Sequence, residues 1–91
     1  EGASEYARFA GIWNVEYDNG DYYEYYELFY DGSWDYYYYD GNNWLLTESG
    51  YIEYNDSYVE FYNQAGLFVF EAFEFDDGNL RSQDFNLRRR Q

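Results

Sequence analysis

The side chains of this chain that could take part in chemistry are almost all carboxylates and phenols. Nineteen Asp and Glu residues stand against five Arg, and fifteen residues are Tyr. There is no Cys, His or Lys. The chain therefore lacks the commonest general base, a thiolate nucleophile, the usual transition-metal ligands and an amine for Schiff-base chemistry. Carboxylates are therefore the catalytic and metal-binding groups left to consider.

A pair of carboxylates could hydrolyse a glycosidic bond if two of them lay about 5–10 Å apart and one had a raised pKa. Glu27 and Glu71 are the best candidates, because each lies on or near a strand face otherwise made of aromatic residues. Acidic side chains are rarely buried, however, so we interpret both as partly exposed residues at a barrel mouth or beside a bulge. We expect no enzyme activity and no catalytic residue.

Two Asp-rich segments, residues 18–21 and 76–79, could be considered as calcium sites because hard cations take oxygen ligands. Both are short, and neither has the twelve-residue alternation with a terminal Glu that marks an EF-hand. Turn formation explains their Asp, Asn and Gly residues better. We therefore expect no metal site and no cofactor.

The tyrosines predict an exposed aromatic face. Residues 36–39 are four consecutive Tyr, so two of these rings point outward whichever face of the strand is buried. The expected outward set is Tyr37 and Tyr39, with Tyr26 beside them. Such a face can stabilise the sheet by cross-strand packing, or it can contact a protein partner or a ring-bearing small molecule. These interpretations stay open at this point.

The net charge of −14 limits the partners. A surface this acidic repels phosphate groups and anionic lipids, so we expect no direct binding to nucleic acid. No apolar run approaches the roughly 18 residues needed to cross a bilayer, so we expect no membrane insertion. With 46% hydrophobic and 29% aromatic residues the chain should nevertheless fold, and its 91 residues suit a single domain over 1–91.

The elements that must position these side chains are short strands separated by evenly spaced turns. Turn-forming Asp, Asn, Gly and Ser residues recur about every 8–12 residues, with no helix-length segment between them. The spacing predicts an all-β fold: an antiparallel up-and-down meander of about seven strands that forms a small barrel or a strongly curved sheet. Residues 1–10 are expected to form a short helical lead-in, because Ser4 is a candidate N-cap and aromatic residues follow three apart.

Two hairpins can be given a predicted register. A two-residue loop at 31–32 would pair Phe29 with Trp34 on the inner face and Tyr26 with Tyr37 on the outer face.

A four-residue loop at 76–79 would pair Glu74 with Arg81, an opposite-charge pair. The same count pairs Glu71 with Asp84, and this like-charge pair predicts a bulge between Phe70 and Phe73.

Residues 88–90 are three consecutive arginines, the only basic cluster in the sequence. We expect residues 88–91 to be a solvated basic tail that offsets acidic neighbours. The alternative is that this tail docks on the acidic face of another copy.

The opening of the first predicted strand, Gly11-Ile12-Trp13, resembles the Gly-x-Trp start of lipocalins and their shorter bacterial lipocalin-like relatives. The likeness extends to residues 26–34, 50–52 and 73–80. This resemblance implies a small up-and-down β-barrel, on a secreted or cell-surface protein, that can hold an apolar ligand. It also implies that Trp13 closes the barrel base against an arginine near the last strand, for which Arg88 is the nearest match.

Together these features predict a non-catalytic binding module for a small apolar or aromatic ligand or a protein partner. In the first interpretation a pocket is lined by six residues: Trp13, Trp34, Tyr36, Phe61, Val69 and Phe73. In the alternative the chain is a self-assembling structural subunit of an extracellular or surface assembly, whose copies meet through Tyr26, Tyr37 and Tyr39 or an open sheet edge. A third interpretation, an acidic mimic of nucleic acid, ranks last because the acidic residues are scattered.

Overall fold

The computed structural model describes residues 6–17, 23–55, 58–75 and 78–90. A single 3-10 turn, η1 (Ala7–Phe9), precedes eight strands. The strands are β1 (Gly11–Glu16), β2 (Glu24–Leu28), β3 (Ser33–Tyr39), β4 (Trp44–Asn55), β5 (Tyr58–Asn63), β6 (Phe68–Glu74), β7 (Leu80–Arg81) and β8 (Asn86–Arg89). The expected helical lead-in is therefore the turn η1, and its candidate cap Ser4 lies outside the described residues.

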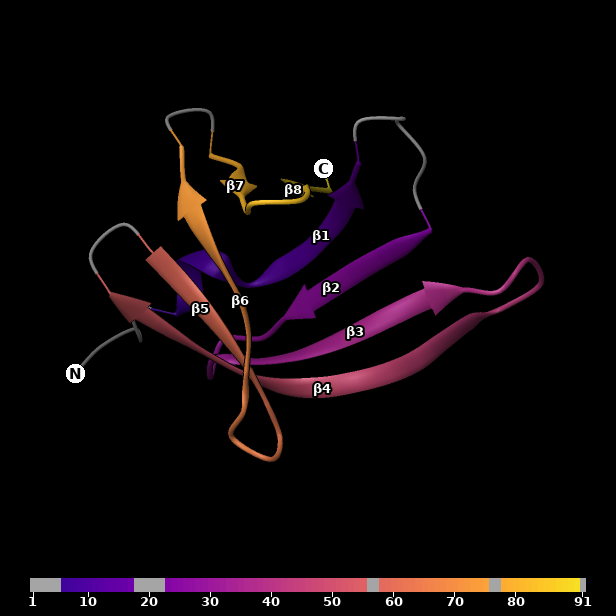
Figure 1. The fold of residues 1–91 in the computed structure, drawn as a ribbon, viewed down its shortest axis with the longest axis horizontal. Helices are drawn as coiled ribbons and strands as arrows, with labels where there is room; N and C mark the ends of the chain where they lie inside the picture. The colour runs from indigo at the N-terminus through magenta and orange to yellow at the C-terminus, as the bar shows by residue number, and fades with distance from the viewer. Residues whose placement is uncertain (1–5, 18–22, 56–57, 76–77, 91) are drawn as a thin grey trace.

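Each strand pairs antiparallel with its neighbours in sequence, and β8 pairs with β1 to close the barrel. Figure 1 shows this order, with β8 returning beside β1. The predicted all-β meander is confirmed, with eight strands where about seven were expected. The shortest of the eight, β7, contains only two residues.

The barrel interior is filled by apolar side chains. Twelve residues make up this core: Phe9, Trp13, Val15, Tyr26, Leu28, Trp34, Ile52, Val59, Phe61, Ala72, Leu80 and Leu87. Phe9 belongs to η1, and the other eleven alternate along their strands with more exposed residues, as a sheet with one buried face requires. Rings meet at its centre, where the centroid of Tyr26 lies 5.4 Å from those of both Trp34 and Phe61.

Gly50 lets β4 cross close to this core. A Cβ atom on Gly50 would lie 2.6 Å from the Trp34 ring and would collide with the backbone oxygen of Tyr62. The Trp34 indole N–H in turn donates to the backbone oxygen of Tyr51 at 2.9 Å. The absence of a side chain at position 50 therefore makes room for the largest ring of the core.

The arginine that contacts Trp13 is Arg89, not Arg88. The Arg89 guanidinium carbon lies 4.3 Å from the centroid of the Trp13 ring. Trp13 and Arg89 are directly paired across β1 and β8, so their side chains share the inner face, whereas Arg88 is opposite Asn14 on the outer face. The arginine suggested by the resemblance was therefore one residue too early.

The predicted register of the β2–β3 hairpin is wrong by one residue. Leu28 lies opposite Trp34 and Tyr26 opposite Tyr36. The loop contains three residues: Phe29 N–H donates to Ser33 O at 2.9 Å, and Gly32 N–H donates to Phe29 O at 3.0 Å. Gly32 has a positive φ of 91°, which suits a type I turn that ends in a bulge.

The predicted register of the hairpin around 76–79 is also wrong by one residue. Phe75 N–H donates to Asn79 O at 3.0 Å, so Glu74 lies opposite Leu80 and Phe73 opposite Arg81. Glu74 forms its ion pair with Arg8 instead. Glu71 lies opposite Glu60, and the register shift lies between β5 and β6 at Phe61/Tyr62, not between β6 and β7.

The three terminal arginines belong to the barrel wall. Arg88 and Arg89 lie in β8, and Arg90 N–H donates to Ile12 O at 2.7 Å. The segment that was expected to be a solvated tail is therefore paired with β1 as far as Arg90.

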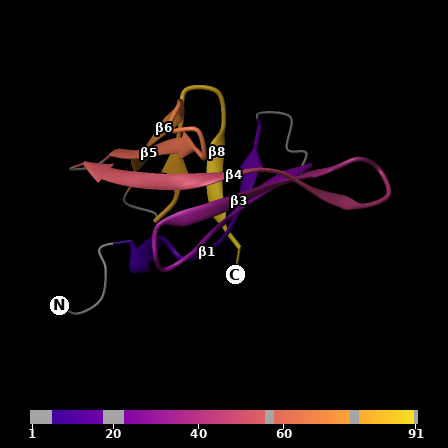
Figure 2. The same ribbon diagram turned by 90° about the horizontal axis from the view of Figure 1, so that it is seen from below.

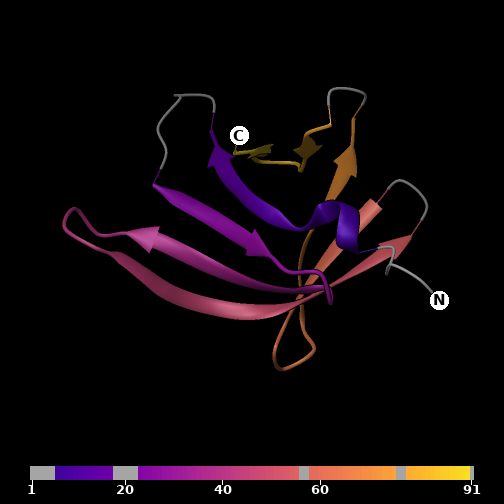
Figure 3. The same ribbon diagram turned by 180° about the vertical axis from the view of Figure 1, so that it is seen from behind.

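The β3–β4 hairpin extends well beyond the rest of the barrel. It points away from β5, β6 and β8 in Figure 1, and the views from below and behind, Figure 2 and Figure 3, show the same projection. The longest dimension of the molecule is 43 Å, against 29 and 25 Å for the other two. Among the described residues, part of β4 therefore has a neighbouring strand on one side only.

Candidate binding groove

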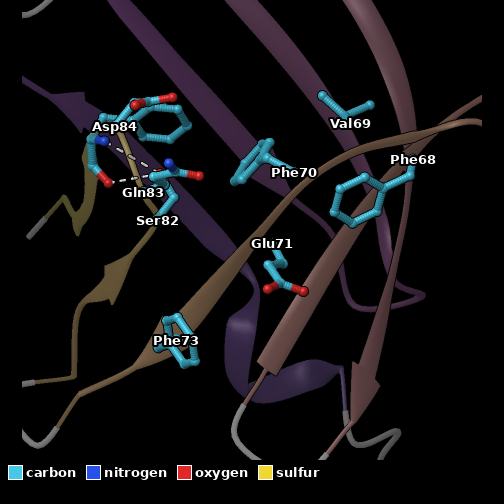
Figure 4. A pocket seen from close by; sticks show the side chains of 9 residues that line it. Phe68, Val69, Phe70, Glu71, Phe73, Ser82, Gln83 and Asp84 are labelled. Atoms are coloured by element: carbon cyan, nitrogen blue, oxygen red, sulfur yellow. Dashed lines mark hydrogen bonds between the residues drawn. The ribbon is translucent and has the colours of Figure 1, made fainter.

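A groove opens where β6 separates from the segment that links β7 to β8. β6 pairs with β7 only through Phe73 and Glu74, so the rest of β6 leaves a gap beside residues 82–85. The groove has a volume of about 710 Å³. Figure 4 shows the residues that line it, which are Phe68, Val69, Phe70, Glu71, Phe73, Ser82, Gln83, Asp84 and Phe85.

The floor of the groove is continuous with the core. Phe70 stacks on Phe61 with their centroids 4.2 Å apart, and Phe85 meets Phe70 edge to face at 5.1 Å. Phe85 is held in place by Ser82, whose hydroxyl donates to Phe85 O at 2.9 Å. The floor therefore consists of rings that are fixed by their own packing.

The rim of the groove is exposed and apolar. Val69 and Phe73 are 37% and 41% exposed, and Phe68 is 56% exposed. Phe73 is braced by Tyr58, whose ring centroid lies 4.5 Å away. Val69 and Phe73 point outward because they alternate with Phe70 and Ala72, which pack toward the core, and Phe68 lies opposite Tyr62 beyond the register shift.

The charge of the groove is negative. Glu71 and Asp84 supply two carboxylates, and none of the nine lining residues is basic. Both carboxylates are exposed. A neutral or cationic ring system therefore meets less electrostatic opposition here than an anionic one.

Behind Phe85, the inner face of the barrel carries a carboxylate with two phenols. Glu24 accepts hydrogen bonds from the hydroxyl of Tyr17 at 2.9 Å and from that of Tyr36 at 2.8 Å, one on each oxygen. Burial, followed by the hydrogen bond to Glu24, raises the pKa of Tyr17 to about 12, and the same causes raise the pKa of Tyr36. Both phenols therefore stay protonated near neutral pH, and their two hydrogen bonds hold the Glu24 carboxylate in position.

The six residues expected to line a ligand pocket lie in three separate places. Trp13, Trp34 and Phe61 are in the closed core, with at most 1% of their surface exposed. Tyr36 lies on the inner face, bonded to Glu24. Val69 and Phe73 line the groove. The structure therefore brings only these last two together at a site open to a ligand.

The groove residues that the sequence did not single out are Phe68, Phe70 and Phe85. Nothing in their local pattern distinguishes them from ordinary strand residues. The groove depends on where β6 and β7 stop pairing, which is a tertiary feature.

The three tyrosines expected on an outward face do not all lie on the same face of the sheet. Tyr26 is buried in the core at 7% exposure, because the one-residue shift of the β2–β3 register turns it inward. Tyr37 stacks on Tyr25 at 4.7 Å, and Tyr39 packs on Trp44 at 5.1 Å. Tyr37 and Tyr39 thus lie on the outer face and pack across strands there.

The two carboxylates considered for glycoside hydrolysis lie on strands that are not neighbours. Glu27 is on the outer face of β2 opposite Asp35, and Glu71 is on β6. Within the described ranges, no group of three or more acidic side chains could hold a metal ion. The same ranges contain no helix long and apolar enough to span a bilayer. Comparisons with protein-family models, with curated proteins and with solved structures found no match to this chain.

Proposed function

We propose that the protein is a non-catalytic, lipocalin-like binding module that holds a small apolar, ring-bearing ligand in the groove between β6 and residues 82–85. The observation that carries this proposal is the groove itself. Its volume of about 710 Å³ falls within the roughly 300–1,000 Å³ typical of small-molecule sites. Aromatic side chains form both its floor and much of its rim.

The proposed ligand site lies on the barrel wall and not in the barrel lumen. The lumen is filled by Trp13, Trp34, Phe61 and their neighbours, whose rings contact one another. A ligand at the lumen would have to displace this core, whereas a ligand in the groove covers side chains that are already exposed. The lipocalin-like part of the proposal draws on the closed meander and on the Trp13–Arg89 contact at its base.

A fluorescence titration with Nile red, a neutral ring system, tests this proposal. We expect saturable binding of one dye per chain, and the variant Phe73→Asp should weaken it by about tenfold, since it replaces an apolar wall with a third carboxylate. Tyr30→Asp is the matched control, because Tyr30 is 73% exposed and is not a groove residue. Non-saturable binding, or an equal loss in both variants, would rule out the groove as the site.

A further inference from the structure

The projecting part of β4 has an open edge. β3 pairs with β4 from Trp44 to Tyr51, but β5 pairs with β4 only from Gly50 onward. The last contact on the β5 side is the hydrogen bond from Gln64 N–H to Ser49 O at 3.1 Å. Among the described residues, no strand pairs with this side of residues 44–48. Figures 1 and 3 show the hairpin extending past the β5–β6 turn, and there nothing is drawn on the side of β4 away from β3.

The backbone groups on this edge have a defined direction. Asp40 N–H donates to Asn43 O at 3.1 Å and closes the hairpin, so Asn43 directs its backbone groups toward β3. Because these directions alternate along an antiparallel strand, Leu45 also faces β3, whereas Trp44 and Leu46 direct their N–H and C=O groups to the open side. Tyr36 pairs with Glu48 and Tyr37 pairs with Leu46, so Thr47 has no partner residue in the β3–β4 register. The regular alternation of backbone directions along this edge of β4 therefore ends at Thr47.

The side chains on the open edge are apolar and uncharged. Trp44 and Leu46 point to the outer face, where Trp44 packs on Tyr25 and Tyr39. Leu45 points to the opposite face. Leu45 and Leu46 are 45% and 57% exposed. Residues 41–47 contain no charged residue, in a chain whose net charge is −14.

These features favour one occupant, a second copy of this chain. Two strongly acidic molecules can approach closely only where neither carries charge, and residues 41–47 meet that condition on both. The segment is also self-complementary in an antiparallel pairing. With a two-fold axis at Leu45, Trp44 of each copy lies opposite Leu46 of the other, and the two Leu45 residues lie opposite one another. Aromatic–aliphatic and aliphatic pairs of this kind stabilise neighbouring strands.

We propose that two copies of the protein pair through the open edge of β4, antiparallel about Leu45, to form one sheet that continues from hairpin to hairpin. Each Trp44–Leu46 pair exchanges its two outward backbone hydrogen bonds. The dimer leaves the groove on β6 free, so it stands independently of the function proposed above. Charge repulsion opposes it, and added salt favours it.

Sedimentation velocity at low salt and at about 1 M salt, where charges are screened beyond about 3 Å, tests the dimer. We expect a species of twice the 11.2 kDa chain mass whose fraction rises with protein concentration and with salt. A chain that stays monomeric at millimolar concentration and high salt would overturn the proposal.

Charged substitutions of Leu45, at the proposed two-fold axis, test whether this edge of β4 is the dimer interface. Leu45→Lys and Leu45→Glu each place like charges opposite one another, and each alone should raise the dissociation constant by about tenfold or more. Mixed in equal amounts, the two variants should associate again, since each Lys then faces a Glu. The control is Leu67→Lys on the β5–β6 turn, which is 64% exposed and should associate like the unaltered chain. Association that is unaffected by Leu45→Lys, or that is lost equally in Leu67→Lys, would contradict this edge as the interface.

Discussion

The Arg89 guanidinium covers the Trp13 ring and also bonds to the backbone just ahead of it. Its Nη1 donates to Ala10 O at 2.7 Å and its Nη2 to Arg8 O at 2.6 Å, while the Trp13 indole donates to Phe9 O at 2.9 Å. One side chain of the last strand thus fixes both the turn η1 and the first strand. The two ends of the described chain are joined at this point.

The first prediction concerns this closure. Arg89→Met keeps the aliphatic stem but removes the guanidinium, so it should lower the free energy of unfolding by about 2–3 kcal/mol, the scale of hydrogen bonds from a charged donor. Arg88→Met is the matched control, because Arg88 pairs with Glu16 on the outer face and should cost under about 1 kcal/mol. Urea unfolding measures both. Equal effects would contradict a special role for Arg89.

The second prediction concerns the crossing of β4 over the core. Gly50→Ala should destabilise the protein by about 3 kcal/mol, because its Cβ would press on the Trp34 ring and the Tyr62 backbone. Thr47→Ala in the same strand is exposed and should change stability by no more than about 0.5 kcal/mol. A Gly50→Ala protein as stable as Thr47→Ala in thermal unfolding would show that both the Trp34 ring and the backbone of β5 can move aside.

The third prediction concerns alkaline pH. The folded pKa of Tyr17, about 12, is above its ordinary value of 10, so the protonated phenol contributes stability that is fully present below pH 10. That contribution is lost as the pH rises from 10 toward 12, since the unfolded chain releases the proton first.

Urea unfolding between pH 8 and pH 11.5 should therefore show stability falling above pH 10, and the fall should be shallower in a Tyr17→Phe protein. Tyr30→Phe serves as the control, because the Tyr30 side chain is largely exposed. Identical slopes for all three proteins would mean that folding does not raise the pKa of Tyr17, through either its burial or its bond to Glu24.

The fourth prediction concerns the charge of the groove. Replacing both of its carboxylates, in Glu71→Gln/Asp84→Asn, should strengthen binding of the anionic dye 1-anilinonaphthalene-8-sulfonate by several-fold and leave Nile red binding almost unchanged. The control, Glu27→Gln/Glu53→Gln, removes the same charge at positions on β2 and β4 that do not line the groove. If both double variants strengthen binding of the anionic dye equally, the effect comes from net charge and not from the groove.

The sequence was sufficient to predict the antiparallel meander, because each turn contains residues that favour turns for a local reason. It was not sufficient to fix the register. Asp31-Gly32 suits both a two-residue loop and the end of a three-residue loop, and these differ by one position. That one position decides whether Tyr26 points into the core or out to solvent.

The site was harder to predict than the fold. Val69 and Phe73 were predicted to line a pocket together with core residues, but they are exposed on the barrel wall, and Phe85 joins them only because the chain between β7 and β8 folds back beside β6. The same holds for Arg89, whose contact with Trp13 depends on which face of β8 turns inward. Both relationships bring together residues far apart in the sequence, so no local pattern contains them.

The central claim is that a ring-bearing ligand binds in the groove on the barrel wall and not in the barrel interior. An NMR titration of the ¹⁵N-labelled protein with indole, a neutral and soluble ring system, measures this directly. We predict saturable shifts of the backbone amides of residues 68–73 and 82–85, with the indole N–H signals of Trp13 and Trp34 unchanged. Shifts of those two indole signals without shifts in the groove, or no saturable shift anywhere, would contradict a binding site on the wall of a filled barrel.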